Sequence, residues 1–228
     1  MKLQFTRLNL TVDIDPEMPT CLQIENRALF SRIVSSLASE LGQDAVEPYV
    51  IWNDAGKEIN PKKAIALLNG LPSVPWDSKA LMGKLYTKVM HSLAQSPDLE
   101  IRLQELSNEV MDEIERLGLE YHGRYEFGVE WSPEVLLKAF GYAPVFEESQ
   151  LFLDNCIRYF EMCVDVGYQV SHFLVNAKSF LDDNEVQALY DQAFFLEMPL
   201  VLLESWHDDR VFEKERKIVL DQHLWLME

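Results

Sequence analysis

The sequence predicts an α/β protein in which a sheet containing parallel strands is flanked by helices, with an α-helical leg projecting from it. Two continuous apolar runs, 169–175 and 199–203, flank a helical pattern that starts after Asp182-Asp183. Uninterrupted apolar strands around one helix are typical of a βαβ unit whose parallel strands are covered on both faces. Between residues 78 and 118 the apolar spacing changes to long helical periods, which indicates a mainly helical part within the α/β chain.

Residues 1–76 have the pattern of strands and a helix, and we assign them to the N-terminal part of a head domain. Residues 1–10 alternate imperfectly between polar and apolar side chains, as in a strand with one covered face. A short second strand is expected at 21–25, after which Asn26 can cap a helix. Residues 46–52 are a third strand candidate.

Residues 77–122 are expected to form the helical leg. Apolar residues recur every four positions over 81–93, and a second periodic stretch covers 103–117. Ser96-Pro97 separates the stretches as a cap followed by a first-turn proline. So tight a connection predicts two roughly antiparallel helices, an αα-hairpin, which a later helix could extend.

Residues 123–228 are expected to complete the head domain with the βαβ unit. Before it, residues 125–130 alternate as a strand, Ser132-Pro133-Glu134 opens a helix, and residues 149–166 form a further helix. Residues 217–220 could add an edge strand. Five residues of the βαβ helix should point inward: Val186, Leu189, Tyr190, Ala193 and Phe194.

The composition is strongly acidic, with 20 Lys+Arg against 38 Asp+Glu and a formal net charge of −18. This balance excludes a generally basic nucleic-acid coat and a polybasic membrane binder. The apolar runs are too short to span a bilayer, and the first residues lack a signal-peptide core. The three cysteines fit neither a disulfide framework nor a cysteine-ligated zinc site, so we expect a soluble, cytoplasmic protein.

Motifs that bind nucleotides or mark a catalytic site are not found in the sequence. After the early strand the chain reads Glu25-Asn26-Arg27, which offers a carboxylate and no glycine to cradle a phosphate. The five histidines have no metal-binding spacing, and no serine lies in a nucleophile-elbow motif. We therefore expect no bound nucleotide and no nucleotide hydrolysis.

Positive charge is concentrated between residues 57 and 88, where six lysines stand against two acids. This local charge of +4 leaves −22 on the rest of the chain. Phosphates could be met in this segment or at isolated cations such as Arg27, Arg32 and Lys138. The alternative is that Lys84 and Lys88, one turn apart, form the solvated face of a helix. The six lysines are Lys57, Lys62, Lys63, Lys79, Lys84 and Lys88.

A second cluster is acidic and lies where the leg, the expected strand and the next helix meet. Carboxylates that converge at a loop suit calcium, which prefers six to eight oxygen ligands. Scattered surface glutamates are the alternative explanation. The four residues are Glu120, Glu126, Glu130 and Glu134.

Several short motifs occur in a fixed order along nearly the whole chain. They are L-F-S-R-I-V at 29–34, G-K-E-I at 56–59, R-Y-E-F at 124–127 with W-S-P-E-V-L-L-K at 131–138, and F-L-V-N at 173–176 with P-L-V-L-L-E-S at 199–205. Together they resemble the Csn-two family of CRISPR-associated adaptation proteins from type II-A systems, in its short form.

The resemblance implies a head domain similar to a P-loop ATPase core without its nucleotide site, together with a helical leg. It implies a homotetrameric ring that binds double-stranded DNA ends through cations lining its hole, with calcium supporting the assembly. It also implies work in spacer acquisition beside the CRISPR integrase pair and the RNA-guided effector nuclease, with no catalysis of its own.

The resemblance places Arg32 and Lys57 at basic positions of the family. Lys62, Lys63 and Lys138 are added as DNA-binding residues because of their charge and proximity, and so is Arg27. The calcium positions correspond approximately to the four glutamates above. Two alternatives stay open: a metal-dependent nuclease that uses the carboxylates at 120–134, and an acidic adaptor that binds only proteins.

Overall fold

The computed structural model describes residues 1–8, 10–145 and 151–227 and divides into two compact units. The first unit, the head domain, comprises Met1–Pro75 and Glu147–Glu228. The second, the helical unit, comprises Trp76–Phe146 and contains the leg expected at 77–122. It also includes residues 123–146, which the sequence pattern places in the head.

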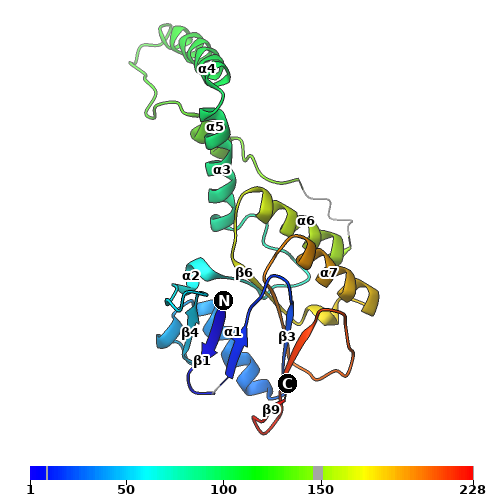
Figure 1. Cartoon of the computed structure of the whole chain (residues 1–228). Helices are drawn as coiled ribbons and strands as arrows, with labels where there is room; N and C mark the ends of the chain where they lie inside the picture. The colour runs from blue at the N-terminus through cyan, green and yellow to red at the C-terminus, as the bar shows by residue number, and fades with distance from the viewer. Residues whose placement is uncertain (9, 146–150, 228) are drawn as a thin grey trace. The chain divides into compact units, whose positions relative to one another are not determined.

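The head domain is built on a six-stranded sheet (Figure 1). Five strands are parallel, and β9 pairs antiparallel with β8. The α/β fold class predicted from the sequence is confirmed, and the expected βαβ unit is β6-α7-β7. In spatial order the strands are β5 (Ile65–Leu68), β6 (Ser171–Val175), β7 (Leu200–Glu204), β3 (Thr20–Ile24), β8 (Arg216–Leu220) and β9 (Leu226–Met227).

Strand β8 was expected at an edge, but it lies between β3 and β9. Strand β5 was not expected from the sequence, and it forms the edge of the sheet opposite β9. It pairs with β6 through Ile65 and Ser171, although the whole helical unit lies between β5 and β6 in the chain. The helical unit is therefore an insertion between two neighbouring strands.

One face of this sheet packs against α1 (Arg27–Ser39) and a small antiparallel sheet. The small sheet has the order β2 (Leu10–Asp13), β1 (Lys2–Phe5), β4 (Tyr49–Trp52). Leu3, Ile33 and Val201 share one hydrophobic core, which joins the small sheet, α1 and the large sheet. Two short helices, η1 (Gly42–Asp44) and α2 (Pro61–Ala64), flank β4.

Helices α6 (Phe152–Asp165) and α7 (Asp183–Phe195) lie on the opposite side of the large sheet from α1 (Figure 1). Cys156 and Cys163 are both on the buried face of α6. Ser149, at the expected start of α6, lies outside the described residues. A short helix, η2 (Ala177–Ser179), follows β6.

The capped helix starts agree with the sequence pattern. Asn26 accepts the Leu29 N–H at the start of α1, and Asp182 and Glu185 form a capping box at the start of α7. The inward position expected for Phe194 is wrong, because its side chain is 39% exposed. The Lys214 Nζ lies 4.0 Å from the centre of the Phe194 ring, so the ring packs under a lysine side chain and not against the sheet.

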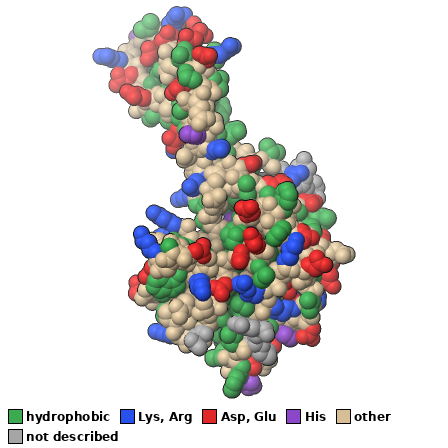
Figure 2. Space-filling model, in the orientation of Figure 1, with side chains coloured by type: hydrophobic (Ala, Val, Ile, Leu, Met, Phe, Trp, Pro, Cys, Tyr) green, Lys and Arg blue, Asp and Glu red, His purple; other side chains and the backbone are tan. Residues whose placement is uncertain are grey.

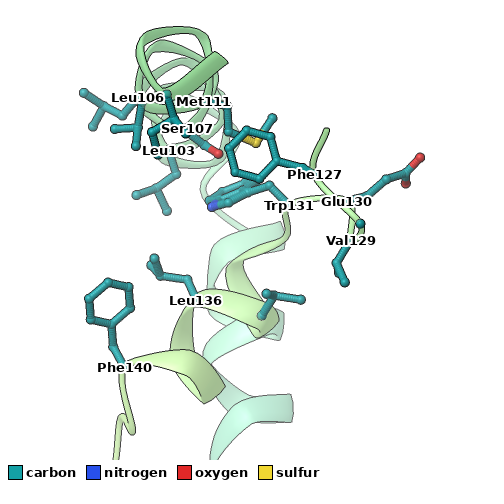
Figure 3. A pocket seen from close by; sticks show the side chains of 14 residues that line it. Leu103, Leu106, Ser107, Met111, Phe127, Val129, Glu130, Trp131, Leu136 and Phe140 are labelled. Carbon is teal, nitrogen blue, oxygen red and sulfur yellow. The ribbon is translucent and has the colours of Figure 1, made fainter. Parts of the chain in front are cut away.

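The helical unit contains α3 (Lys79–Ala94), α4 (Pro97–Gly118) and α5 (Pro133–Ala139). The antiparallel αα-hairpin is not formed: α4 is seen along its axis in Figure 3, whereas α3 runs lengthwise through the same view. Apolar side chains of α4 and of the segment before α5 instead line a common groove. Among the helices in the described ranges, none is both long and apolar enough to cross a membrane.

The strand expected at 125–130 is also wrong, because this segment is irregular. Alternation of apolar residues produces a strand only where another strand can complete its hydrogen bonds. Tyr125, Phe127 and Val129 remain exposed, and the described part of the helical unit contains helices and loops but no strand.

Candidate nucleic-acid interface

Three of the predicted DNA-binding lysines lie in and just after the turn that follows β4. Hydrogen bonds to Asn53 close this turn: its N–H donates to the Lys57 carbonyl at 2.9 Å, and its Oδ1 accepts the Lys57 N–H at 2.8 Å. Asn60 then caps α2 by accepting the Lys62 N–H at 3.0 Å, and Pro61 occupies the first helical position. These local bonds hold the lysines on exposed backbone.

We call Lys57, Lys62 and Lys63 the basic edge of the head domain. All three side chains are exposed, and Figure 2 shows Lys and Arg side chains gathered beside the place of α2 in Figure 1. Lys62 Nζ lies 3.8 Å from Glu40 Oε2, an exposed pair of low energy. Within the described ranges Lys57 and Lys63 have no ion-pair partner, so their charges are open to a ligand.

Arg32 differs from these lysines because its guanidinium is already engaged. Its Nε lies 2.5 Å from Oε1 of Glu47, whose side chain is only 9% exposed. The Glu47 N–H in turn donates to the Ser36 hydroxyl at 2.8 Å. Arg32 is 47% exposed, so part of the side chain still faces solvent while it neutralises a buried carboxylate. A structural role for Arg32 therefore stands beside the predicted DNA-binding role.

Arg27 lies far from the basic edge along α1. It is the first residue of this 13-residue helix, whereas Glu40, the partner of Lys62, caps the other end. At about 1.5 Å per residue the helix separates these ends by roughly 20 Å. Arg27 is exposed, and a phosphate bound there would not contact the basic edge at the same time.

Lys138 belongs to the helical unit and pairs with a residue predicted to bind calcium. Its Nζ lies 2.6 Å from Glu134 Oε1, one turn earlier on α5. Both line a groove of about 490 Å³ between α3 and α5, together with Lys79 and Tyr86. The sequence places Lys79 in the basic segment without distinguishing it from its neighbours, and only its position opposite α5 identifies it as a candidate.

The four predicted calcium ligands do not form a metal site within the described residues. All four are exposed, and among the residues that the structure describes no three His, Cys, Asp or Glu side chains are placed to share a metal ion. Glu134 pairs with Lys138, and the Glu130 side chain points away from Phe127 and Trp131 (Figure 3).

A second groove, lined by α4, the segment before α5 and α5 itself, is apolar and has a volume of about 660 Å³. Figure 3 shows Phe127 and Trp131 beside α4, with Leu136 and Phe140 towards the other end of the groove. Along α4 several large apolar side chains remain exposed, and exposed apolar surface of this extent is typical of a contact with another protein. They are Leu106, Val110, Ile114 and Leu117.

The head domain is a parallel α/β fold whose first βα turn lacks a phosphate-binding loop, and a helical unit interrupts it between β5 and β6. This combination defines the structural class of the protein. The family model described as "CRISPR-associated protein (Cas_Csn2)" matches residues 43–224. The chain belongs to this family, the Csn-two family that its motifs resemble, and its role is therefore related to adaptation in CRISPR systems.

Comparison with solved structures supports the same fold. The crystal structure of Stu0660 of Streptococcus thermophilus matches with a TM-score of 0.60 at 15% sequence identity. The match covers 95% of this chain and 74% of the other. A search of curated proteins gave no significant match.

Proposed function

We propose that the chain is a ring-forming, non-catalytic protein that binds double-stranded DNA ends without sequence preference during CRISPR spacer acquisition. The observation that carries this proposal is the basic edge, a group of exposed and largely unpaired lysines on an otherwise acidic chain. Family membership supplies the CRISPR context. Duplex DNA bears a dense line of phosphates, and lysines without acidic partners can replace its counterions.

The acidic net charge decides how DNA must be bound. A protomer of −18 gives a tetramer of −72, four times the single-chain charge, which repels DNA at long range. At physiological salt the Debye length is about 8 Å, so charges on an outer surface are screened from DNA inside a ring. Lysines of the basic edge that face the hole would dominate the local field, and the binding would depend strongly on salt.

The apolar groove and the exposed apolar stripe of α4 support assembly into a homotetramer. An exposed stripe of leucine, valine and isoleucine costs free energy in water, and burial against another chain removes this cost. The CRISPR integrase pair and the RNA-guided effector nuclease remain the proposed protein partners, and they follow from the family resemblance.

Calcium is proposed only to support assembly of the tetramer, a role that the family resemblance implies. Because the predicted ligands do not converge in the described residues, no step of DNA binding is assigned to it. Native mass spectrometry with and without a chelator tests the assembly role. A tetramer that loosens on chelation supports it, and a tetramer indifferent to chelation removes calcium from the proposal.

The basic edge is tested by changing Lys57, Lys62 and Lys63 together to Gln. Affinity for a linear duplex should fall, and the slope of log affinity against log salt should decrease by about 0.9 for every phosphate that the protein no longer neutralises. A matched control changes Lys2, Arg158 and Lys214 to Gln, which removes the same charge from other exposed positions of the head. Equal effects of the two triple variants would show that net charge alone matters.

The same labelled duplex distinguishes the alternative functions. Cleavage in calcium or magnesium that is abolished in Glu130→Ala would favour the metal-dependent nuclease. No binding at low salt by a folded, assembled protein would favour the protein-binding adaptor. Binding without cleavage supports the proposal.

A further inference from the structure

The carboxyl edge of the large sheet contains a cluster of buried charges. Glu204 is the last residue of β7 and lies opposite Gln23 of β3 in the parallel ladder. From β3 the chain goes on to β5 at one side of the sheet, whereas from β7 it goes on to β8 at the other side. In open α/β sheets this reversal of direction is where ligands bind. In this protein buried side chains fill the position.

Glu204 is completely buried and has few partners. Its Oε1 accepts the backbone N–H of Lys178 at 3.0 Å. Its Oε2 has no hydrogen-bond partner, and no cation lies within 4.0 Å of the carboxylate among the residues that the structure describes. A single amide donor does not compensate for the burial of a charged carboxylate.

The neighbouring cations are already paired with the other two buried carboxylates. The fully buried Lys178 Nζ lies 2.7 Å from Glu215 Oε1 and 3.7 Å from Asp208 Oδ2. Lys217 Nζ lies 3.5 Å from Asp208 Oδ1, and Arg210 Nη2 lies 3.2 Å from Asp208 Oδ2. The titratable and charged groups around Glu204 are Cys21, Lys178, Tyr190, Asp208, Arg210, Glu215 and Lys217.

Burial is the largest influence on Glu204 and disfavours its charged form. The Asp208 carboxylate adds repulsion, and together they raise the pKa of Glu204 to about 7, against the attraction of Lys178 and Arg210. The geometry also favours a protonated Glu204. An ionised Glu204 would be a third buried carboxylate, and the cations near it are already paired with Asp208 and Glu215.

We propose that Glu204 carries a proton while the loop of residues 205–215 packs against the sheet edge, and that loss of this proton loosens the loop from this edge. The loop is held there by the Asp208 N–H, which donates to Gln23 Oε1 at 3.3 Å, and by Lys217 Nζ, which donates to the Asp208 carbonyl at 3.1 Å. An ionised Glu204 repels the Asp208 side chain and attracts Lys178 away from Glu215. Both changes weaken the interactions that close the loop.

The proton is tested directly in the full-length protein by following the glutamate side-chain carboxyl carbons by NMR from pH 4 to pH 8. Glu204→Gln assigns the signal, because it removes the carboxyl and keeps a neutral group of the same shape. We expect one glutamate that titrates near pH 7 and is missing in Glu204→Gln. A Glu204 carboxyl already ionised at pH 5 would overturn the proposal. So would an unaltered chain in which no glutamate carboxyl titrates near pH 7, and this outcome does not depend on whether the variant folds.

Loop opening is tested by amide hydrogen-exchange protection factors at Ser205 and Asp208, which correct for intrinsic exchange. In the unaltered protein protection at these amides should fall as the pH rises through about 7. In Glu204→Gln it should stay constant. Glu213→Gln removes an exposed charge from the same loop and should behave like the unaltered protein. Identical pH dependence in Glu204→Gln and the unaltered protein would show that Glu204 does not control the loop.

The stability of the head gives a third readout. The folded state binds the Glu204 proton more tightly than the unfolded chain, whose glutamates titrate near 4.5. This contribution to stability is complete below pH 4.5 and disappears as the pH rises through about 7. The unfolding equilibrium constant of the unaltered protein should therefore rise relative to that of Glu204→Gln by up to about tenfold per pH unit in this window. A constant ratio would contradict the proposal.

Discussion

Lys138 Nζ lies 2.6 Å from Glu134 Oε1, so one ion pair joins a predicted DNA-binding residue to a predicted calcium ligand. The two side chains are four residues apart on α5, and at least half of each is exposed. An exposed pair of this kind is worth only about 0.3 to 0.5 kcal/mol. A phosphate or a metal ion can therefore displace either partner at small cost, but neither residue is free in the unbound chain.

The Glu134–Lys138 pair predicts opposite effects of two neutral substitutions. Glu134→Gln should release the Lys138 charge and raise the affinity for a linear duplex, whereas Lys138→Gln should lower it and reduce the salt slope by about 0.9. The measurement is fluorescence anisotropy over a series of salt concentrations. Unchanged affinity in both variants would remove Lys138 from the DNA interface.

Arg32 should contribute to stability whether or not it contacts DNA. Arg32→Ala leaves the Glu47 carboxylate without its ion-pair partner, and we expect the free energy of unfolding to fall by about 1 to 2 kcal/mol, a value reduced because Arg32 is half exposed. Urea unfolding measures this decrease. The double variant Arg32→Ala, Glu47→Gln should recover most of it, because the unpaired charge is gone. A double variant no more stable than Arg32→Ala would contradict this account.

His172 predicts a loss of stability in acid. It is completely buried between the aromatic rings of Tyr159, Phe160 and Tyr168, and burial lowers its pKa from 6.5 to about 4. The unfolded chain therefore takes up the proton first, so stability should fall by up to about 1.4 kcal/mol per pH unit between pH 6.5 and about 4. Urea midpoints measured over this range for the unaltered protein and His172→Gln test the slope, which the variant should reduce.

Glu204 acts in the opposite direction over an overlapping range of pH. Its stabilising contribution decreases as the pH rises from 4.5 to about 7, while that of His172 increases as the pH rises from about 4 to 6.5. The two slopes partly cancel in the unaltered protein. In His172→Gln the free energy of unfolding should therefore increase towards acid pH relative to the unaltered protein. In Glu204→Gln it should increase towards neutral pH. A shift of the pH dependence in the same direction in both variants would show that the role given to one of the two residues is wrong.

The proposed ring predicts a preference for DNA that has ends. A linear duplex can thread through a closed ring, whereas a covalently closed circle of equal length and sequence can enter only if the ring opens. Competition gels should therefore show weaker binding of the circle at every salt concentration. Equal competition by both forms would place the DNA on an outer surface of the assembly.

The sequence predicts the head best where local pattern and tertiary environment agree. The continuous apolar runs before and after α7 are buried on both faces, and they form β6 and β7 as expected. Strand β5 was missed because its four residues directly follow the short helix α2, which starts at Pro61, and no separate turn signal lies between them. The opposite error at 125–130 arose because alternation was present but no strand was available to pair with it.

The same reasoning explains what could be predicted of the candidate site. Lys57, Lys62 and Lys63 are close in the sequence, so their clustering could be predicted from the printed chain. The partners of Arg32 and Lys178 could not, because Glu47 and Glu215 reach them from other elements of the fold. A signal for the buried cluster does exist in the sequence: Glu204 directly follows the uninterrupted apolar run 199–203. Charged residues are almost never fully buried unless they are paired, so a glutamate at the end of a buried strand indicates partners.

The insertion of the helical unit between β5 and β6 has a consequence for the order of folding. The Ile65–Ser171 pairing closes a loop that contains the entire helical unit, whereas β6 and β7 are joined through α7 alone. Long-range pairing must overcome its loop entropy before its hydrogen bonds form, so it is slow compared with local pairing. We expect β5 to join the sheet after the β6-α7-β7 unit has formed, which leaves the β6 edge open to other chains during synthesis and refolding.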